Sequence, residues 1–348
     1  MDGGFFSKLN RRISRSDASP NGLLCVGLDP YLDELAEKAA GATISTPHGL
    51  SGGTTRFSQV LYKQCCDLVD ETSPYAAAFK PNIAFFEALG KDGFEVLQAV
   101  CNHISADIPV LLDVKRGDIG NTAEMYARCY FSILGVDAIT VNPYMGTETV
   151  LPYLSYPGKA IFALCKTSNP GSSEFQQLAV HPFRQNLTLP SFHTGSSFAE
   201  KSNLQVLSLS TNSPAMEAQT SSTLPLYMEV ARRFRDMATA TSHKDSTMLT
   251  ESSKNIGLVV GATDVTAVAT VRNAWEDVWL LTPGIGAQGG DLTALLTAGL
   301  RKDCLGVLIP ISRGISRAES SRQAAKEWHF KINKLRNSIR KQMDFVED

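Results

Sequence analysis

The residues best suited to chemistry lie in the stretch 109–122. An apolar run there leads into alternating charges at Asp113, Lys115 and Asp118. Such a run is typical of a buried strand, and side chains alternate in direction along a strand, so Asp113 and Lys115 should point to the same side. Charges at the end of a buried strand are unfavourable unless they are paired. A structural ion pair would meet that need, but paired, partly desolvated charges are also where pKa values are tuned, which favours a catalytic site.

The strand before these charges is one of eight similar apolar stretches in the chain. The eight stretches are 23–30, 76–82, 109–122, 137–143, 160–168, 255–263, 278–286 and 305–312. Continuous apolar strands that alternate with helical segments predict a parallel sheet covered by helices. Eight strands are also the number that closes a (β/α)8, or TIM, barrel.

Polar or otherwise distinctive residues follow nearly every predicted strand. They are Asp29, Lys80, Asp113, Lys115, Asn142, Ser168, Thr263, Gly286 and Arg313. In a closed barrel all of them converge on one mouth, whereas in an open doubly wound sheet they would spread along an edge. The sequence therefore favours a single parallel, eight-stranded (β/α)8 domain over residues 1–348.

Residues from about 175 to 223 interrupt the alternation of strands and helices. Ser, Thr, Asn and Gln dominate this region, and its apolar residues keep no sustained period. We interpret it as a polar, flexible insertion in the barrel. Helices are predicted over 85–104, 226–237 and 265–274, and a last helix carries an apolar stripe from Ala325 to Ile339.

The overall composition excludes several classes of partner. The chain has 33 basic and 35 acidic residues, so no nucleic-acid or membrane partner is implied. No apolar stretch is long enough to span a bilayer, and residues 1–20 lack the apolar core of a signal peptide. Seven cysteines without a pairing pattern suit a reducing compartment, so a cytoplasmic location is expected.

A glycine-rich stretch after the seventh strand suits anion binding. The segment from Gly284 to Gly289 has the spacing of a dinucleotide fingerprint, but it follows the seventh strand rather than the first. Together with Arg313 and Gly314 after the eighth strand, it suits the usual phosphate site of a barrel. Gln288 can donate hydrogen bonds and Arg313 can form a charged fork, although Arg313 could also be an ordinary surface cation.

The polar strand ends fall within six motifs. They are Gly27-Leu-Asp29-Pro30, Phe79-Lys80-Pro81-Asn82, Asp113-Val-Lys115-Arg-Gly-Asp118, Lys166-Thr-Ser168-Asn-Pro-Gly171, Pro283-Gly-Ile-Gly-Ala-Gln288 and Ser312-Arg313-Gly314. Taken together, these motifs resemble those of orotidine 5'-phosphate decarboxylase. The resemblance covers the strands from residue 23 to 314 but not the insertion. It is greatest to the longer subfamily, which has extra loops.

The resemblance implies a role for each matching residue. The catalytic set would be Lys80, Asp113, Lys115 and Asp118, with Asp118 and Thr122 reaching the neighbouring subunit's site in a homodimer. The substrate-binding residues would be Asp29, Lys80 and Asn82 for the ribose, Ser168 for the pyrimidine, and Gln288, Arg313 and Gly314 for the phosphate.

The implied reaction converts orotidine 5'-monophosphate to uridine 5'-monophosphate and CO2, without a cofactor or metal. Lys115 would stabilise a carbanion at C6 and then protonate it. The motifs leave two alternatives open. One is a metal-dependent sugar-phosphate decarboxylase or aldolase of the same superfamily, and the other is a non-catalytic barrel that only binds nucleotides.

Overall fold

The eight predicted strands form one parallel sheet in the computed structural model, which describes residues 4–14, 22–31, 34, 55–182, 223–240 and 255–347. The sheet order is β2-β1-β10-β9-β8-β5-β4-β3. The strands are β1 (Leu24–Leu28), β2 (Ala78–Pro81), β3 (Leu111–Arg116), β4 (Ala138–Val141), β5 (Ala160–Lys166), β8 (Ile256–Val260), β9 (Trp279–Leu281) and β10 (Val307–Ile311). Parallel bridges from Phe79 to Val110 and from Asn82 to Asp113 join β2 to β3 and close the barrel. The predicted (β/α)8 fold is confirmed.

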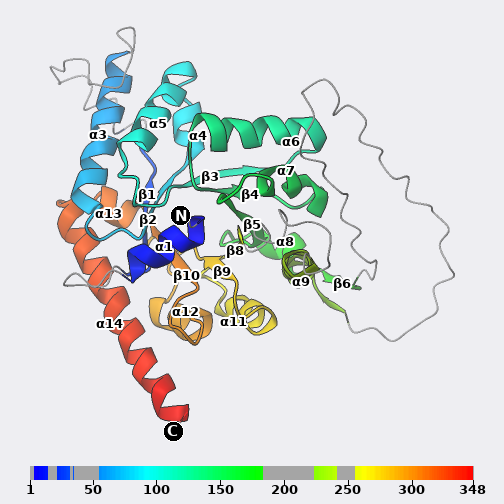
Figure 1. Ribbon diagram of the computed structural model, residues 1–348. Helices are drawn as coiled ribbons and strands as arrows, with labels where there is room; N and C mark the ends of the chain where they lie inside the picture. Colours follow the sequence, from blue (N-terminus) through cyan, green and yellow to red (C-terminus); the bar gives the residue numbers. More distant parts are fainter. Residues whose placement is uncertain are drawn as a thin grey trace.

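Helices surround the strands (Figure 1). They are α3 (Arg56–Thr72), α4 (Ile83–Glu87), α5 (Lys91–His103), α6 (Gly120–Ala127) with its π-helical continuation (Arg128–Ile133), α7 (Leu151–Leu154), α8 (Ser172–Gln176), α9 (Leu226–Ala240), α11 (Val265–Ala274), α12 (Leu292–Gly299), α13 (Arg313–Ser316) and α14 (Ser321–Glu347). Because helices cover the outside and side chains fill the inside, the strands are buried on both faces, which explains their continuous apolar sequences. No helix in the described part of the chain is long and apolar enough to cross a membrane.

The single helix predicted over 85–104 is wrong, because the chain forms α4 and α5 there. Gly90 lies between them with a φ of 62°, in the left-handed region that glycine adopts without strain. A Cβ atom at Gly93 would lie 1.8 Å from the carbonyl oxygen of Phe86, so the close approach of the two helices also requires a glycine. The apolar period continues across the break, which is why the sequence suggested one helix.

A helix that the sequence did not predict, α1 (Phe5–Ile13), covers the amino-terminal ends of the strands. The ring of Phe6 stacks on Trp279 at the start of β9, with 5.9 Å between ring centroids. Arg12 donates a 2.8 Å hydrogen bond to the carbonyl oxygen of Ala76, just before β2, and Lys8 pairs with Asp137, just before β4. This helix therefore closes the end of the barrel opposite the polar strand ends.

The described ends of the predicted insertion are tied together. Strand β6 (Ala179–Val180) pairs antiparallel with β7 (Leu224–Pro225), directly before α9. Residues 183–222, which make up most of the predicted insertion, lie outside the described residues.

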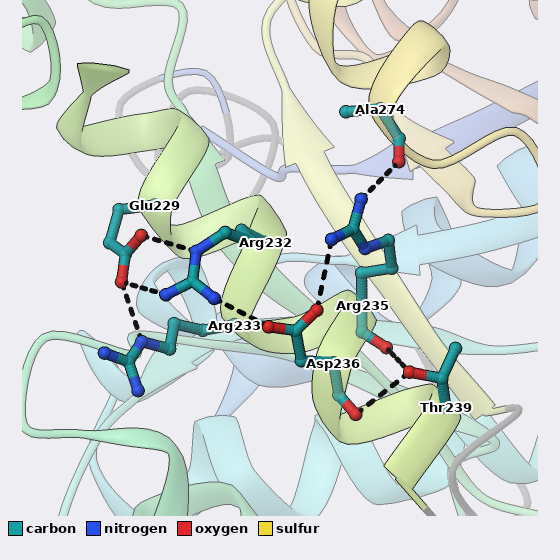
Figure 2. A network of polar contacts seen from close by, with 7 residues as sticks. All are labelled: Glu229, Arg232, Arg233, Arg235, Asp236, Thr239 and Ala274. Atoms are coloured by element: carbon teal, nitrogen blue, oxygen red, sulfur yellow. Dashed lines mark hydrogen bonds and ion pairs between the residues drawn. The ribbon is translucent and has the colours of Figure 1, made fainter. Parts of the chain in front are cut away.

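Helix α9 carries a network of charged side chains that links it to α11 (Figure 2). Glu229 accepts hydrogen bonds from Arg232 and Arg233, and Arg232 also pairs with Asp236 at 2.7 Å. Arg235 donates to the carbonyl oxygen of Ala274 at the end of α11. These pairs of Glu229 and Asp236 lie within α9, and the bond from Arg235 ties this helix to α11.

Candidate active site

Asp113 is the centre of a charged network at the carboxyl ends of β2 and β3. Its Oδ2 atom lies 2.7 Å from the Nζ atom of Lys80, and its Oδ1 atom lies 2.5 Å from the Nζ atom of Lys115. Lys80 and Asp113 are buried, whereas the Lys115 side chain is 51% exposed. The arrangement therefore presents one ammonium group to the barrel mouth and holds it with a buried carboxylate.

Thr140 of β4, which belongs to none of the sequence motifs, shapes this network. Its hydroxyl donates to Asp113 Oδ1 at 2.9 Å and accepts from the backbone N–H groups of Val114 and Lys115. The pairing register between β3 and β4 shifts at this point, and Lys115 has a φ of 45°, which is uncommon for a residue with a side chain. One hydroxyl thus stabilises a bulge and orients the carboxylate. The only sequence signal was a lone polar residue in an apolar strand.

Burial and charge act in opposite directions on the two buried groups. Burial raises the pKa of Asp113, but the ammonium groups of Lys80 and Lys115 outweigh it and hold that pKa well below its usual range. Burial lowers the pKa of Lys80, but the carboxylates of Asp113 and Asp29 outweigh it and raise that pKa. Both groups therefore stay charged across the physiological pH range.

Asp29 and Asn82 lie beside the network, at the ends of β1 and β2. Asp29 Oδ2 accepts a hydrogen bond from the hydroxyl of Ser312 at the end of β10. Asn82 Oδ1 accepts a 3.3 Å hydrogen bond from the backbone N–H of Ala84 and so caps α4. That cap fixes the Asn82 side chain at the rim of the barrel.

The expected phosphate-binding residues come from two adjacent turns. Gly284, Gly286 and Gly289 all have positive φ values, and the N–H of Gly290 donates to the carbonyl oxygen of Gly284, which folds the turn after β9 tightly. Cβ atoms at Gly286 and Gly314 would lie 3.7 and 3.4 Å from Trp328, so this turn and the start of α13 meet at one indole. Gln288 and Arg313 are exposed there.

Ser168 lies close to the same glycine turn. A Cβ atom at Gly284 would be 3.5 Å from the Ser168 Cβ atom, and one at Gly261 would be 2.8 Å from it. The backbone carbonyl of Ser168 accepts a hydrogen bond from the Thr263 hydroxyl at 3.3 Å. The ends of β5, β8 and β9 are thereby packed side by side at the mouth.

Asp118 and Thr122 are not brought to the network within one chain. Asp118 Oδ1 accepts a hydrogen bond from the N–H of the next residue, Ile119, and Thr122 is exposed on α6. Among the described residues, no hydrogen bond or ion pair joins Asp118 to Lys115. The expectation that both residues act in a neighbouring subunit's site stays a prediction.

Comparison with known proteins gives the same family from the sequence and from the fold. A family model described as "Orotidine 5'-phosphate decarboxylase / HUMPS family" matches residues 22–187 and 178–328. An orotidine 5'-phosphate decarboxylase of Roseiflexus sp. (strain RS-1) is 34% identical over 316 residues, which are 91% of each chain. The solved OMP decarboxylase of Leishmania donovani is 36% identical, with a TM-score of 0.67, over 96% of this chain and 98% of that one. The UMP synthase of Leishmania donovani is 37% identical, with a TM-score of 0.69, over 96% of this chain and 57% of that one.

A closed barrel of eight parallel strands with a lysine–aspartate–lysine network at its mouth defines a (β/α)8-barrel enzyme. Within that class, the chain belongs to the orotidine 5'-phosphate decarboxylase / HUMPS family. The family recognised from the sequence motifs, and the carboxy-lyase class expected with it, are confirmed.

Proposed function

We propose that the chain converts orotidine 5'-monophosphate to uridine 5'-monophosphate and CO2, as a step of de novo pyrimidine biosynthesis. The observation that supports this most strongly is the network of Lys80, Asp113 and Lys115, with one ammonium group open to the mouth and two charges buried behind it. Loss of CO2 leaves a pair of electrons on C6 of the pyrimidine, and a fixed positive charge stabilises them.

Lys115 acts as the acid in this proposal. Its ammonium group stabilises the negative charge that develops at C6 and then donates a proton to that carbon, which replaces the lost carboxylate by hydrogen. Asp113 holds the ammonium in place through the 2.5 Å contact and keeps Lys80 charged behind it. The substrate carboxylate lies near Asp113 before it leaves, and repulsion between the two favours its departure.

The remaining mouth residues bind the substrate in the order in which they lie around the barrel. Asp29, Lys80 and Asn82 bind the ribose, and Ser168 contacts the pyrimidine. Gln288, Arg313 and the backbone of Gly314 hold the phosphate, where the turn after β9 meets the start of α13. Binding of the distant phosphate provides energy for positioning the reacting carbon.

The working unit in this proposal is a homodimer in which Asp118 and Thr122 enter the partner's site. Large apolar side chains are exposed close to these residues, in the segments that follow β3 and β4. They are Ile119, Met125, Tyr144 and Met145. Burial of such side chains against a second copy would remove apolar surface from water and bring Asp118 to a neighbouring mouth. We place the enzyme in the cytoplasm, in keeping with its seven free cysteines.

A metal-dependent sugar-phosphate decarboxylase or aldolase is the nearest alternative within the fold. Among the described residues, no group of three or more His, Cys, Asp or Glu side chains is placed to hold a metal ion. Asp113 is instead engaged by two ammonium groups and a hydroxyl. We therefore expect turnover of orotidine 5'-monophosphate to survive EDTA, and loss of activity on chelation would favour the alternative.

The decisive experiment follows the absorbance of orotidine 5'-monophosphate with purified protein and no added metal. A non-catalytic nucleotide-binding barrel would leave the absorbance unchanged. Replacement of Lys115 by Ala should abolish turnover in a folded protein, because both the charge and the proton are lost. The matched control is Lys63→Ala, which removes an exposed lysine paired with Asp67 on α3 and should leave kcat unchanged. Near-normal kcat in Lys115→Ala would contradict the assignment.

A further inference from the structure

Ser312 contacts Asp29 at the barrel mouth and has no role of its own in the proposed reaction. It follows β10, which pairs with β1, and its hydroxyl donates to Oδ2 of Asp29. The other carboxylate oxygen, Oδ1, is buried and has no hydrogen-bond partner among the described residues. Hydrogen bonds to a charged acceptor are strong and directional, so this single contact determines how the Asp29 carboxylate is turned.

Gly27 provides the space in which this contact forms. A Cβ atom at Gly27 would lie 2.0 Å from the hydroxyl oxygen of Ser312 and 2.9 Å from its Cβ atom. Gly27 is not one of the glycines with positive φ, so its backbone would accept another residue. The glycine is needed because the Ser312 side chain occupies the position that a side chain on β1 would take.

The carboxylate held in this way belongs to the same charged cluster as the catalytic network. Asp29 contributes, after Asp113, to keeping Lys80 protonated. The buried Oδ1 atom has no donor, so the orientation of the carboxylate depends on the bond that Oδ2 accepts. Asp29 is partly exposed, and Oδ2 can accept a second hydrogen bond, so a hydroxyl group of a bound ligand can donate to it from the mouth.

We propose that Ser312 is a positioning residue that turns the Asp29 carboxylate toward a ribose hydroxyl of the substrate, and that Gly27 is required to admit it. This inference rests on the proposed function, because it takes Asp29 as a ribose-binding residue. Ser312 directly precedes Arg313 and Gly314, so one turn orients the ribose and holds the phosphate.

The first test removes the hydroxyl and asks whether its effect passes through Asp29. Ser312→Ala should lower kcat/KM for orotidine 5'-monophosphate by about tenfold to a hundredfold, the range for loss of a hydrogen bond to a charged group. In an Asp29→Ala background the same change should have no further effect, because the two residues act as a unit. The control Ser321→Ala loses a hydroxyl bond to the Ile315 carbonyl and should retain wild-type kcat/KM.

Two outcomes of this first test would overturn the proposal. One is a Ser312→Ala variant with the kcat/KM of the wild type. The other is an effect of Ser312→Ala that multiplies with that of Asp29→Ala, because independent effects would show that Ser312 does not act through the carboxylate.

The second test separates positioning from packing. Gly27→Ala should lower Tm, because its methyl group meets the Ser312 hydroxyl. Gly27→Ala combined with Ser312→Gly should restore Tm to that of Ser312→Gly. In this double variant the atom nearest to the new methyl group is the Cα atom of residue 312, at 3.2 Å. The restored double variant should still have the low kcat/KM of Ser312→Ala. A double variant that does not regain Tm, or that regains full kcat/KM, would contradict the proposal.

Failure of this inference can be told apart from failure of the proposed function. If the wild-type protein does not turn over orotidine 5'-monophosphate, the proposed function is wrong, and the positioning role falls with it. The Tm values of the Gly27 variants would still test whether a glycine at position 27 is needed to make room for the Ser312 side chain. If the wild type is active and Ser312→Ala is equally active, only the positioning role is wrong.

Discussion

At the scale of single residues, the site depends on one buried carboxylate that serves two cations. Replacement of Asp113 by Asn removes the carboxylate that pairs directly with the buried Lys80 ammonium and leaves only the more distant Asp29 to balance it. We expect a loss of about 3–5 kcal/mol in the free energy of unfolding, measured by urea denaturation at pH 7. The control Asp67→Asn breaks an exposed pair with Lys63 and should cost less than about 1 kcal/mol. Equal effects of the two variants would show that Asp113 contributes no more than a surface charge.

The free energies of unfolding of the wild type and Asp113→Asn should differ by an amount that depends on pH, because the pKa of Asp113 is lowered. A carboxyl group with a lowered pKa in the folded state contributes its full stability above its ordinary pKa, and the contribution is lost as pH falls toward the folded-state value. The stability difference between wild type and Asp113→Asn should therefore be constant from pH 8 to 5. It should narrow only below about pH 4, near the ordinary pKa of Asp. Narrowing that begins near neutral pH would contradict the assignment.

At the scale of elements, the bulge in β3 is held by the Thr140 hydroxyl of β4. Thr140→Val keeps the shape of the side chain but leaves the N–H groups of Val114 and Lys115 without their acceptor. We expect a loss of about 1–3 kcal/mol per unsatisfied group in the free energy of unfolding, together with a lower kcat, because Asp113 loses its orienting donor. Thr140→Ser retains the hydroxyl and should behave like the wild type in both measurements. Wild-type kcat and stability in Thr140→Val would show that the bulge does not need the hydroxyl.

At the scale of the whole molecule, the proposed homodimer makes a prediction about mixed subunits. Lys115→Ala and Asp118→Asn should each be inactive alone. In a mixed dimer, one mouth combines the intact Lys115 of one chain with the intact Asp118 of the other, so mixing the two unfolded variants and refolding them together should restore activity. The measurement is turnover after refolding, with the dimer verified by sedimentation. If Asp118 acts within its own chain, the mixture stays inactive.

The barrel could be predicted from the sequence because the pattern that indicates each strand is local and recurs eight times. Each strand is a short apolar run that ends in a polar residue, so both the strands and their common mouth could be found without coordinates. The contacts made across strands were not predictable in the same way. One such contact is the hydrogen bond that the Thr140 hydroxyl donates to Asp113, and another is the space that Gly27 leaves for Ser312. Both depend on the register between strands, which no single segment encodes. Helix α1 was missed because its partners, such as Trp279, are far away in the sequence.

The stacking of Phe6 on Trp279 has a consequence for how this chain folds during its synthesis on the ribosome. Helix α1 is synthesised long before β9, and β1 long before its neighbour β10, so these two contacts form only when translation is nearly over. During that interval the apolar face of α1, formed by Phe5, Phe6, Leu9 and Ile13, is incompletely covered on the nascent chain. We expect chaperones to bind this face in the cell, and misassembly during rapid overproduction to begin there.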